Sequence, residues 1–324
     1  MSEGHVVAFS RRLGELGPIE EALAQRTGAR LRVVPLATEE ELISAGREAD
    51  VLVVGAVEPV TSRVLAALER ARLIVRRGVG LDNVDVAAAE ELGIPVAYVP
   101  DGSVEEVSDH AVALLLALER RVAASDRIVR AGGAPGTLAD GARRFSELTV
   151  GVVGFGRIGR ATAGKLRGLV GSVRVSDPAV DPRTIGELGY DAVDLDGLFA
   201  TSDAITLHVP LLEATRGLVD ARRLAGVRPG LTIVNTARGE LIDERALLEA
   251  IRDGRVAGAA LDVTAVEPLP TDSPLLAEPS LLLTGHTAAK GQASGRTLRT
   301  AVATAIERWL AGEEPPFLAR GAQG

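Results

Sequence analysis

The chain has 324 residues, of which 46% are hydrophobic and 25% are charged, a composition that fits a soluble globular protein. A chain of this length, 33.6 kDa in mass, is too large to fold around a single hydrophobic core, so two domains are expected. The lack of cysteine excludes disulfides, thiolate metal sites and a cysteine nucleophile, and no metal centre is predicted. The net charge of −8 argues against nucleic-acid binding as a main activity, because the phosphate backbone requires a clustered positive surface.

The sequence gives no sign of a membrane partner. The longest aliphatic run, residues 111–118, is far shorter than the ~20 residues that span a bilayer. Residues 5–9 form a short apolar segment followed by Ser10, Arg11 and Arg12, which predicts a first strand and not a signal peptide. We therefore expect a cytoplasmic location.

Apolar runs alternate with helix-like stretches along the first hundred residues, which is the pattern of a parallel α/β domain. Five strands with helices between them predict a small doubly wound sheet. The expected strands are 5–9, 31–35, 51–55, 73–76 and 95–99, and the expected helices are 18–24, 39–47, 62–70 and 84–92.

Ser103 and Glu106 have the spacing of a helix start, and apolar residues then follow at steps of three and four as far as Val122. This predicts one long helix that ends near Gly132 and Gly133. Its apolar residues cover more than one face. A helix that bridges two domains or subunits and a buried core helix both fit this pattern.

Residues 154–159 have the spacing Gly-x-Gly-x-x-Gly. The run 148–153 before them reads as a buried strand, and the residues from Arg157 to Leu169 have near-helical apolar spacing. In such a strand–turn–helix unit, Gly154 permits a tight turn, Gly156 lets the backbone approach a pyrophosphate, and Gly159 lets the helix pack on the strand. The helix N-terminus would offer N–H groups to the phosphates. A dinucleotide-binding site is predicted.

The expected second strand, 172–176, ends at Asp177, eighteen residues after Gly159. A carboxylate at this point can accept hydrogen bonds from the hydroxyls of the adenosine ribose and would repel a 2′-phosphate. Pro178, Ala179 and Val180 follow without an arginine that could bind such a phosphate. NAD is therefore favoured over NADP.

The alternation continues after the glycine turn, with six strands expected at 148–153, 172–176, 204–208, 231–235, 257–261 and 281–284. Six strands suit a full dinucleotide-binding fold. A single long helix, 293–310, then remains and cannot form a domain by itself. The chain is therefore expected to hold one domain inserted in another, with the last helix packed on the N-terminal part.

In an open α/β sheet the ligand lies outside the carboxyl ends of the strands. Three side chains there suit hydride transfer to a 2-oxo acid: Arg238, Glu267 and His286. Arg238 can bind the substrate carboxylate and polarise the carbonyl, and His286 can exchange a proton with that oxygen. Glu267, if hydrogen-bonded to the imidazole, would orient it and favour its protonated form.

The chain has only three other histidines. His5 lies at the start of the chain, and His110 falls inside the long helix beside Asp109. His208 ends a strand, where contact with a cofactor is as plausible as catalysis. By spacing alone, a structural role for His286 stays as open as a catalytic one.

Several segments in order resemble the D-isomer-specific 2-hydroxyacid dehydrogenases, over nearly the whole chain. Beside the glycine turn, the segments that carry this resemblance are 76–85, 103–107, 208–210, 235–239, 261–263, Glu267-Pro268 and His286. The resemblance implies a Rossmann NAD-binding domain, 101–289, inserted in a discontinuous flavodoxin-like substrate domain, 1–100 and 290–324. It also implies that closure of the two domains over the cofactor assembles the site, and that the protein is a homodimer.

Arg238, Glu267 and His286 match the catalytic residues of that family in order. Backbone amides around Gly78, Val79 and Gly80 are expected to bind the carboxylate of a small 2-hydroxy or 2-oxo acid, together with Arg238, and Arg76 is a further candidate for an anionic group. The residues expected to bind the cofactor are Val107, Gly154, Gly156, Arg157, Ile158, Gly159, Asp177, His208, Pro210, Thr236, Ala237, Arg238, Asp262 and His286.

The chain departs from the family pattern at two places. Gly285 stands where a proline commonly precedes the catalytic histidine, which loosens the local backbone and spares the chemistry. Gly55 stands where members that act on phosphoglycerate usually have an arginine for the phosphate. With no regulatory domain expected after residue 324, 3-phosphoglycerate is the less favoured substrate.

Two alternatives stay open. One is an NAD(H)-sensing protein similar to the corepressors of the same fold, against which the complete set of Arg238, Glu267 and His286 argues. The other keeps the enzyme and changes the substrate, to a phosphonate, a branched 2-oxo acid or an intermediate of specialised metabolism.

Overall fold

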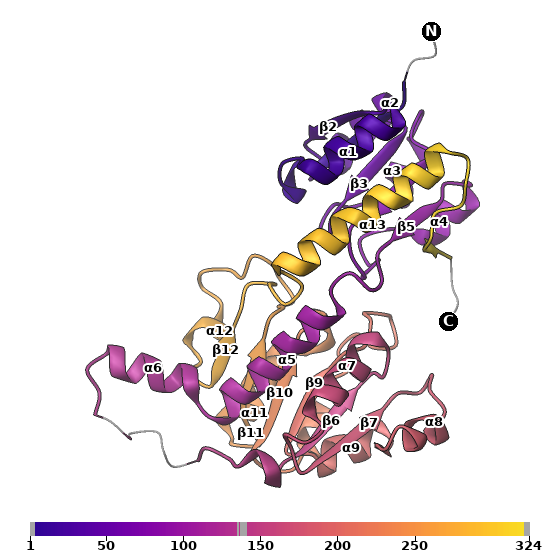
Figure 1. Cartoon of the computed structure of the whole chain (residues 1–324). Coiled ribbons are helices and arrows are strands. Elements are labelled where there is room, and N and C mark those ends of the chain that lie inside the picture. The colour runs from indigo at the N-terminus through magenta and orange to yellow at the C-terminus, as the bar shows by residue number, and fades with distance from the viewer. Residues whose placement is uncertain (1–3, 135, 137–140, 321–324) are drawn as a thin grey trace. The chain divides into compact units, whose positions relative to one another are not determined.

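A computed structural model of the chain describes residues 4–134, 136 and 141–320. The chain forms two compact units (Figure 1). Residues 1–103 and 290–324 make up one, which we call the discontinuous unit, and residues 104–289 make up the other, the inserted unit. Each unit is built around its own sheet.

The sheet of the discontinuous unit has the order β13-β5-β4-β3-β1-β2. All its neighbours pair in parallel except β13, which is antiparallel to β5. Without β13 the order is the 2-1-3-4-5 of flavodoxin-like folds. The strands are β1 (Val6–Ser10), β2 (Arg30–Val34), β3 (Val51–Val54), β4 (Leu73–Arg76), β5 (Val96–Tyr98) and β13 (Leu318–Ala319).

The central strand β3 is apolar and buried on both faces, because helices cover each side of the sheet. Val51 and Val53 of β3 pack in one core with α1 and α13, whereas Leu52 and Val54 pack in the other with α2, α3 and α4. This alternation follows from the two-residue period of a strand. The helices are α1 (Pro18–Thr27), α2 (Glu39–Glu48), α3 (Ser62–Ala66), α4 (Val86–Glu91) and α13 (Gln292–Leu310), and a 3-10 turn, η1, spans Arg11–Leu13.

The sheet of the inserted unit is parallel and has the order β12-β11-β10-β9-β6-β7-β8. Counted from its own first strand this is 3-2-1-4-5-6 with a seventh strand added, the order of the Rossmann fold. The predicted fold class is therefore confirmed. The strands are β6 (Thr149–Val153), β7 (Ser172–Ser176), β8 (Asp191–Ala192), β9 (Ala204–Leu207), β10 (Leu231–Asn235), β11 (Val256–Leu261) and β12 (Leu281–Leu283).

Helices also cover both faces of the second sheet. Buried residues of α5, α7 and α8 pack against one face, and those of α9, α10, α11 and α12 pack against the other. The helices are α5 (Val104–Glu119), α6 (Val122–Arg130), α7 (Arg157–Leu166), α8 (Pro182–Glu187), α9 (Leu195–Thr201), α10 (Ala221–Ala225), α11 (Glu244–Arg252) and α12 (Pro274–Ala277), with the 3-10 turns η2 (Phe145–Glu147) and η3 (Gly239–Leu241).

Two predictions about elements were wrong. The long helix predicted from Ser103 to about Gly132 is two helices, because Arg121 adopts the left-handed conformation (φ 54°) and ends the hydrogen-bond ladder between α5 and α6. Strands β8 and β13 were not predicted. Each has only two residues, and Asp191 and Ala192 in β8 are exposed, so neither strand leaves an apolar pattern in the sequence.

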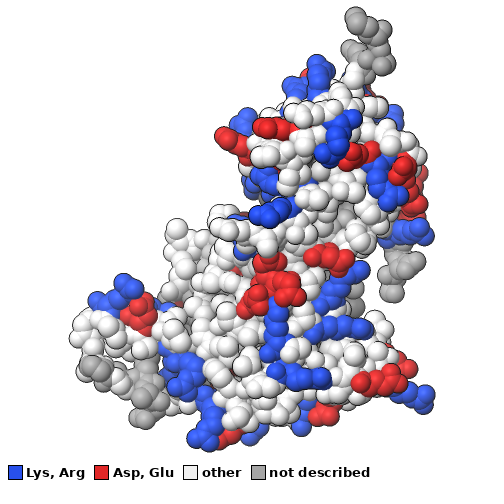
Figure 2. All heavy atoms as spheres, in the orientation of Figure 1, with Lys and Arg blue, Asp and Glu red and all other residues white. Residues whose placement is uncertain are grey.

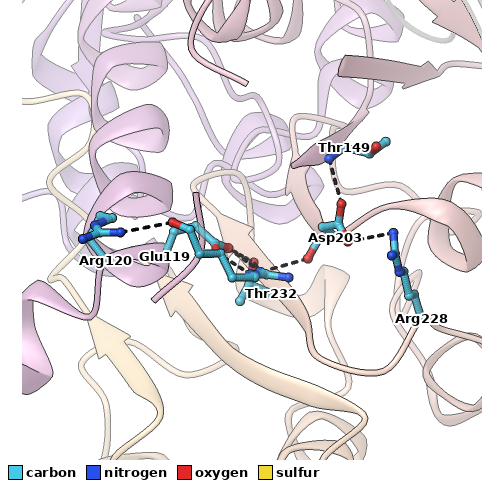
Figure 3. Close-up of polar contacts among 7 residues, drawn as sticks. Glu119, Arg120, Thr149, Asp203, Arg228 and Thr232 are labelled. Atoms are coloured by element: carbon cyan, nitrogen blue, oxygen red, sulfur yellow. Dashed lines mark hydrogen bonds and ion pairs between the residues drawn. The ribbon is translucent and has the colours of Figure 1, made fainter. Parts of the chain in front are cut away.

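A charged cluster around the buried Glu119 ties the end of α5 to the amino ends of three strands (Figure 3). Glu119 is 1% exposed; Arg143 donates to its two oxygens at 2.7 and 2.6 Å, and the Thr232 hydroxyl donates to it at 2.5 Å. Nearby, Asp203 accepts the N–H of Thr149 at 2.8 Å and pairs with Arg228 at 2.9 Å. The cluster lies at the sheet edge opposite the carboxyl ends of the strands.

Across residues 4–134, 136 and 141–320, every helix is too short or too polar to serve as a membrane span. On the face drawn in Figure 2, basic and acidic side chains are intermingled over both units.

Candidate active site in the inserted unit

The glycine turn joins β6 to α7 as predicted from its spacing. Gly154 has φ 91°, and a Cβ there would lie 2.8 Å from the backbone of His208. A Cβ on Gly159 would lie 2.0 Å from the Gly154 carbonyl oxygen, whereas one on Gly156 would meet no atom within 4 Å. The first and third glycines are therefore required by the turn itself, and the second leaves open space of the kind a pyrophosphate needs.

The start of α7 offers backbone donors beside this open space. Gly156 is the N-cap and supplies no side-chain cap. Because glycine has no side chain, the N-cap residue itself cannot cover the start of the helix, which is common at a phosphate-binding helix N-terminus. Arg157 and Ile158 occupy the first turn, Arg157 exposed and Ile158 half-buried.

Asp177 follows β7, the neighbour of β6 in the sheet. Its half-buried carboxylate accepts the N–H of Phe155 at 2.6 Å and that of Ala179 at 2.8 Å, one on each oxygen. These bonds fix the carboxylate beside the glycine turn. Each oxygen keeps a second lone pair, which is what acceptance of ribose hydroxyls requires.

The predicted residues after β9 and β10 lie at neighbouring strand ends. Burial lowers the pKa of His208 to about 3, so its ring is neutral near pH 7, and its Nε2 lies 2.9 Å from the Thr206 hydroxyl. The Thr236 hydroxyl is buried and has no hydrogen-bond partner among the described residues. A buried polar atom without a partner is a common sign of a missing ligand, and Thr236 is one of the residues expected to contact the cofactor.

His286 and Glu267 meet directly. His286 Nδ1 lies 2.7 Å from Glu267 Oε2, and both side chains are about one-third exposed, at 37% and 33%. The other carboxylate oxygen of Glu267 accepts the Thr264 N–H at 3.2 Å. Because Nδ1 faces the carboxylate, Nε2 is the ring nitrogen available for proton exchange.

The loop of Arg238 lies against the loop that leads to Glu267. A Cβ on Gly239 would lie 2.0 Å from the Thr264 carbonyl carbon, so the two backbones pack in contact after β10 and β11. The half-buried Arg238 side chain donates from Nη1 to the Ala237 carbonyl at 2.6 Å. The three predicted catalytic residues thus come from adjoining loops of one unit.

Asp262, predicted to contact the cofactor, is 1% exposed, and its carboxylate binds its own chain. It accepts the Thr284 hydroxyl at 2.6 Å and the N–H groups of Thr287 and Ala288, both at 2.9 Å. Burial by itself would raise the pKa of Asp262, but these hydrogen bonds outweigh it, so the pKa is lowered. Asp262 therefore holds an anionic carboxylate under the loop that carries His286.

The sequence analysis missed two residues of this region, Thr284 and His110. His110 Nε2 lies 3.2 Å from the Thr284 hydroxyl. The one available signal was position: His110 comes three residues after Val107, so both lie on one face of α5. Val107 is buried, and Pro210, the other predicted cofactor contact, is exposed.

The predicted substrate-binding residues Arg76, Gly78, Val79 and Gly80 lie in the discontinuous unit, at and just after the end of β4. Arg76 is 6% exposed and donates from Nη1 to the Arg77 carbonyl at 3.0 Å.

Comparison with known proteins agrees with this architecture. Residues 112–288 match the family model "D-isomer specific 2-hydroxyacid dehydrogenase, NAD binding domain". The chain is 40% identical over 304 residues to D-3-phosphoglycerate dehydrogenase of Mycobacterium leprae, covering 92% of this chain and 57% of that protein. It is 40% identical over 234 residues to hydroxypyruvate reductase of Thermotoga maritima, covering 72% of this chain and 75% of the relative.

Among solved structures, the TT0316 protein of Thermus thermophilus superposes with a TM-score of 0.87 at 32% identity, over 97% of this chain and 99% of that one. The chain spans about half the length of several phosphoglycerate dehydrogenases it matches, between 49% and 57% of each. The fold, the glycine turn and these matches lead to one conclusion: the chain belongs to the D-isomer specific 2-hydroxyacid dehydrogenase family, and its inserted unit is the NAD-binding domain.

Proposed function

We propose that this protein is an NAD-dependent oxidoreductase that interconverts a small D-2-hydroxy acid and its 2-oxo acid. The observation that carries the proposal is the 2.7 Å contact between His286 Nδ1 and Glu267 Oε2, on loops at the carboxyl edge of an NAD-binding sheet. An imidazole held in this way on a carboxylate has the arrangement of a general acid–base group.

The residues act as follows. His286 donates a proton from Nε2 to the carbonyl oxygen as the 2-oxo acid is reduced, and accepts it back during oxidation. Glu267 holds the ring in the orientation that presents Nε2. Arg238, with a planar and permanently charged guanidinium, binds the substrate carboxylate and polarises the carbonyl. Bound NADH supplies the hydride, and NAD⁺ accepts it in the reverse direction. Arg76 and the amides of residues 78–80 stay the predicted substrate contacts of the discontinuous unit.

The relatives and Gly55 both bear on the class of substrate. Phosphoglycerate and hydroxypyruvate enzymes are both among the relatives at 40% identity. Gly55 supports a substrate without a phosphate, because glycine has no side chain that could bind one where members acting on phosphoglycerate usually have an arginine, and the nearest carboxylate there is that of the buried Glu58. We therefore propose an unphosphorylated small 2-oxo acid.

A panel of 2-oxo acids tests this proposal. Hydroxypyruvate, glyoxylate, pyruvate, a branched 2-oxo acid and 3-phosphohydroxypyruvate would be followed by NADH absorbance, with NADPH in parallel. We expect turnover of at least one unphosphorylated acid and a preference for NADH, because Asp177 would repel a 2′-phosphate. Tight NADH binding with background oxidation across the panel would instead favour the NAD(H)-sensing alternative.

We also propose a homodimer. Helix α6 has no buried residue, and its Val122 and Val129 are 56% and 61% exposed. Exposed apolar side chains gathered on one element are typical of an interaction surface. Light scattering should therefore give twice the chain mass of 33.6 kDa, and Val129→Glu should shift the protein toward the monomer without loss of helical circular dichroism. A monomeric wild type would contradict the proposal.

A further inference from the structure

His110 lies inside the inserted unit but takes no part in the pair formed by His286 and Glu267. Its side chain is 26% exposed, and its Nε2 lies 3.2 Å from the Thr284 hydroxyl and 3.4 Å from Asp262 Oδ1. His110 belongs to α5, whereas Thr284 directly follows β12, so the contact joins parts of the chain 174 residues apart.

The loop that carries His286 is wrapped around Asp262. The Asp262 carboxylate accepts hydrogen bonds from residues on both sides of His286, namely Thr284, Thr287 and Ala288. The Asp262 carbonyl accepts the N–H of His286 itself at 2.7 Å. His286 has φ 53°, a left-handed conformation that an L-residue adopts at some cost. These bonds to one buried residue therefore hold the loop in a strained conformation.

The hydrogens available on each group show which atom donates in the contact between His110 Nε2 and the Thr284 hydroxyl. The hydrogen bonds on Asp262 lower its pKa, so the carboxylate is ionised and can only accept. The Thr284 hydroxyl, 2.6 Å from Oδ1, must then donate its single proton to Asp262. Toward His110 the same oxygen can only accept, so the hydrogen must lie on His110 Nε2.

We propose that His110 is a positioning residue for the reaction: its Nε2–H holds the Thr284 hydroxyl on Asp262 and thereby keeps the His286 loop in its working conformation. This inference rests on the proposed function, since it assigns a role through His286. Within the part of the chain that the structure describes, the hydrogen bond and ion pair of His110 go to Thr284 and Asp262, and its effect reaches the reaction by way of these two residues.

Nitrogen-15 NMR of the histidine rings tests the proton assignment without any substrate. The chain has four histidines, so single substitutions assign every ring. We expect the His110 signal to show a protonated Nε2, and the His286 signals to shift or broaden in His110→Phe but to stay near wild type in His110→Gln, whose amide still donates. A neutral His110 with its proton on Nδ1, or a His286 ring indifferent to His110→Phe, would overturn the inference.

Steady-state kinetics test the consequence. Loss of one hydrogen bond of this kind costs about 1 kcal/mol, so His110→Phe should lower kcat by roughly fivefold to tenfold, with the Kd for NADH within about twofold of wild type. His110→Gln should recover most of the loss. Thermal unfolding of each variant shows that the rates refer to folded protein. Equal kcat in wild type and folded His110→Phe would refute the positioning role. If wild type turns over no substrate, the proposed function fails, while the NMR result still decides the role of His110.

Discussion

Replacement of His286 by alanine is expected to lower kcat by about 10²–10⁴-fold, the range for loss of a general acid–base group. The reason is local: Nε2 of His286 is the nitrogen left for proton exchange when Nδ1 binds Glu267. Binding of NADH, measured by fluorescence titration, should change far less than kcat, because His286 is only one of the expected cofactor contacts and the glycine turn and Asp177 remain intact.

Two further variants sharpen this test. Glu267→Gln keeps an oxygen that can accept from Nδ1 but removes the charge, and should therefore cost less than His286→Ala. His5→Gln is the matched control, because His5 lies in the discontinuous unit with 52% of its side chain exposed and is none of the predicted catalytic or cofactor-binding residues, so this variant should leave the proton-transfer step intact. Turnover by His286→Ala equal to wild type would remove His286 from the mechanism.

Replacement of Glu119 by alanine is expected to destabilise the inserted unit by roughly 3–5 kcal/mol, as is typical when one partner of a buried ion pair is removed. Glu119 is 1% exposed and binds both Arg143 and Thr232. Its loss would leave the Arg143 guanidinium, itself only 29% exposed, without the carboxylate that compensates its burial.

Urea unfolding followed by far-ultraviolet circular dichroism would measure this change. The single tryptophan, Trp309, lies in α13 of the discontinuous unit, so its fluorescence reports that unit and serves as an internal comparison. Glu147→Ala is the matched control, because Glu147 pairs with Arg144 at 2.7 Å with both side chains well exposed, and should change stability little. If the two glutamate variants unfold alike, the cluster in Figure 3 does not stabilise the unit.

Much of the fold could be predicted because parallel strands and amphipathic helices leave periodic apolar patterns. All eleven predicted strands are present within one or two residues of their expected bounds. The failures have local causes. The left-handed Arg121 interrupts an apolar spacing that continues across it, and the two residues of β8 are too exposed to form a pattern.

By itself, the sequence determined the class of cofactor and the edge of the sheet at which the candidate site residues lie. The spacing of Gly154, Gly156 and Gly159 depends on backbone geometry over a few residues, which a linear sequence records. The placement of Arg238, Glu267 and His286 after strands follows from the same local order.

Only the tertiary structure decided which atoms meet. The contact of His286 Nδ1 with Glu267 spans 19 residues, and that of His110 with Thr284 spans 174. Such contacts depend on how separate strands and helices pack in three dimensions, and packing of distant segments imposes no spacing on the sequence. This is why sequence reasoning could propose His286 as the acid–base group but overlooked His110 and Thr284.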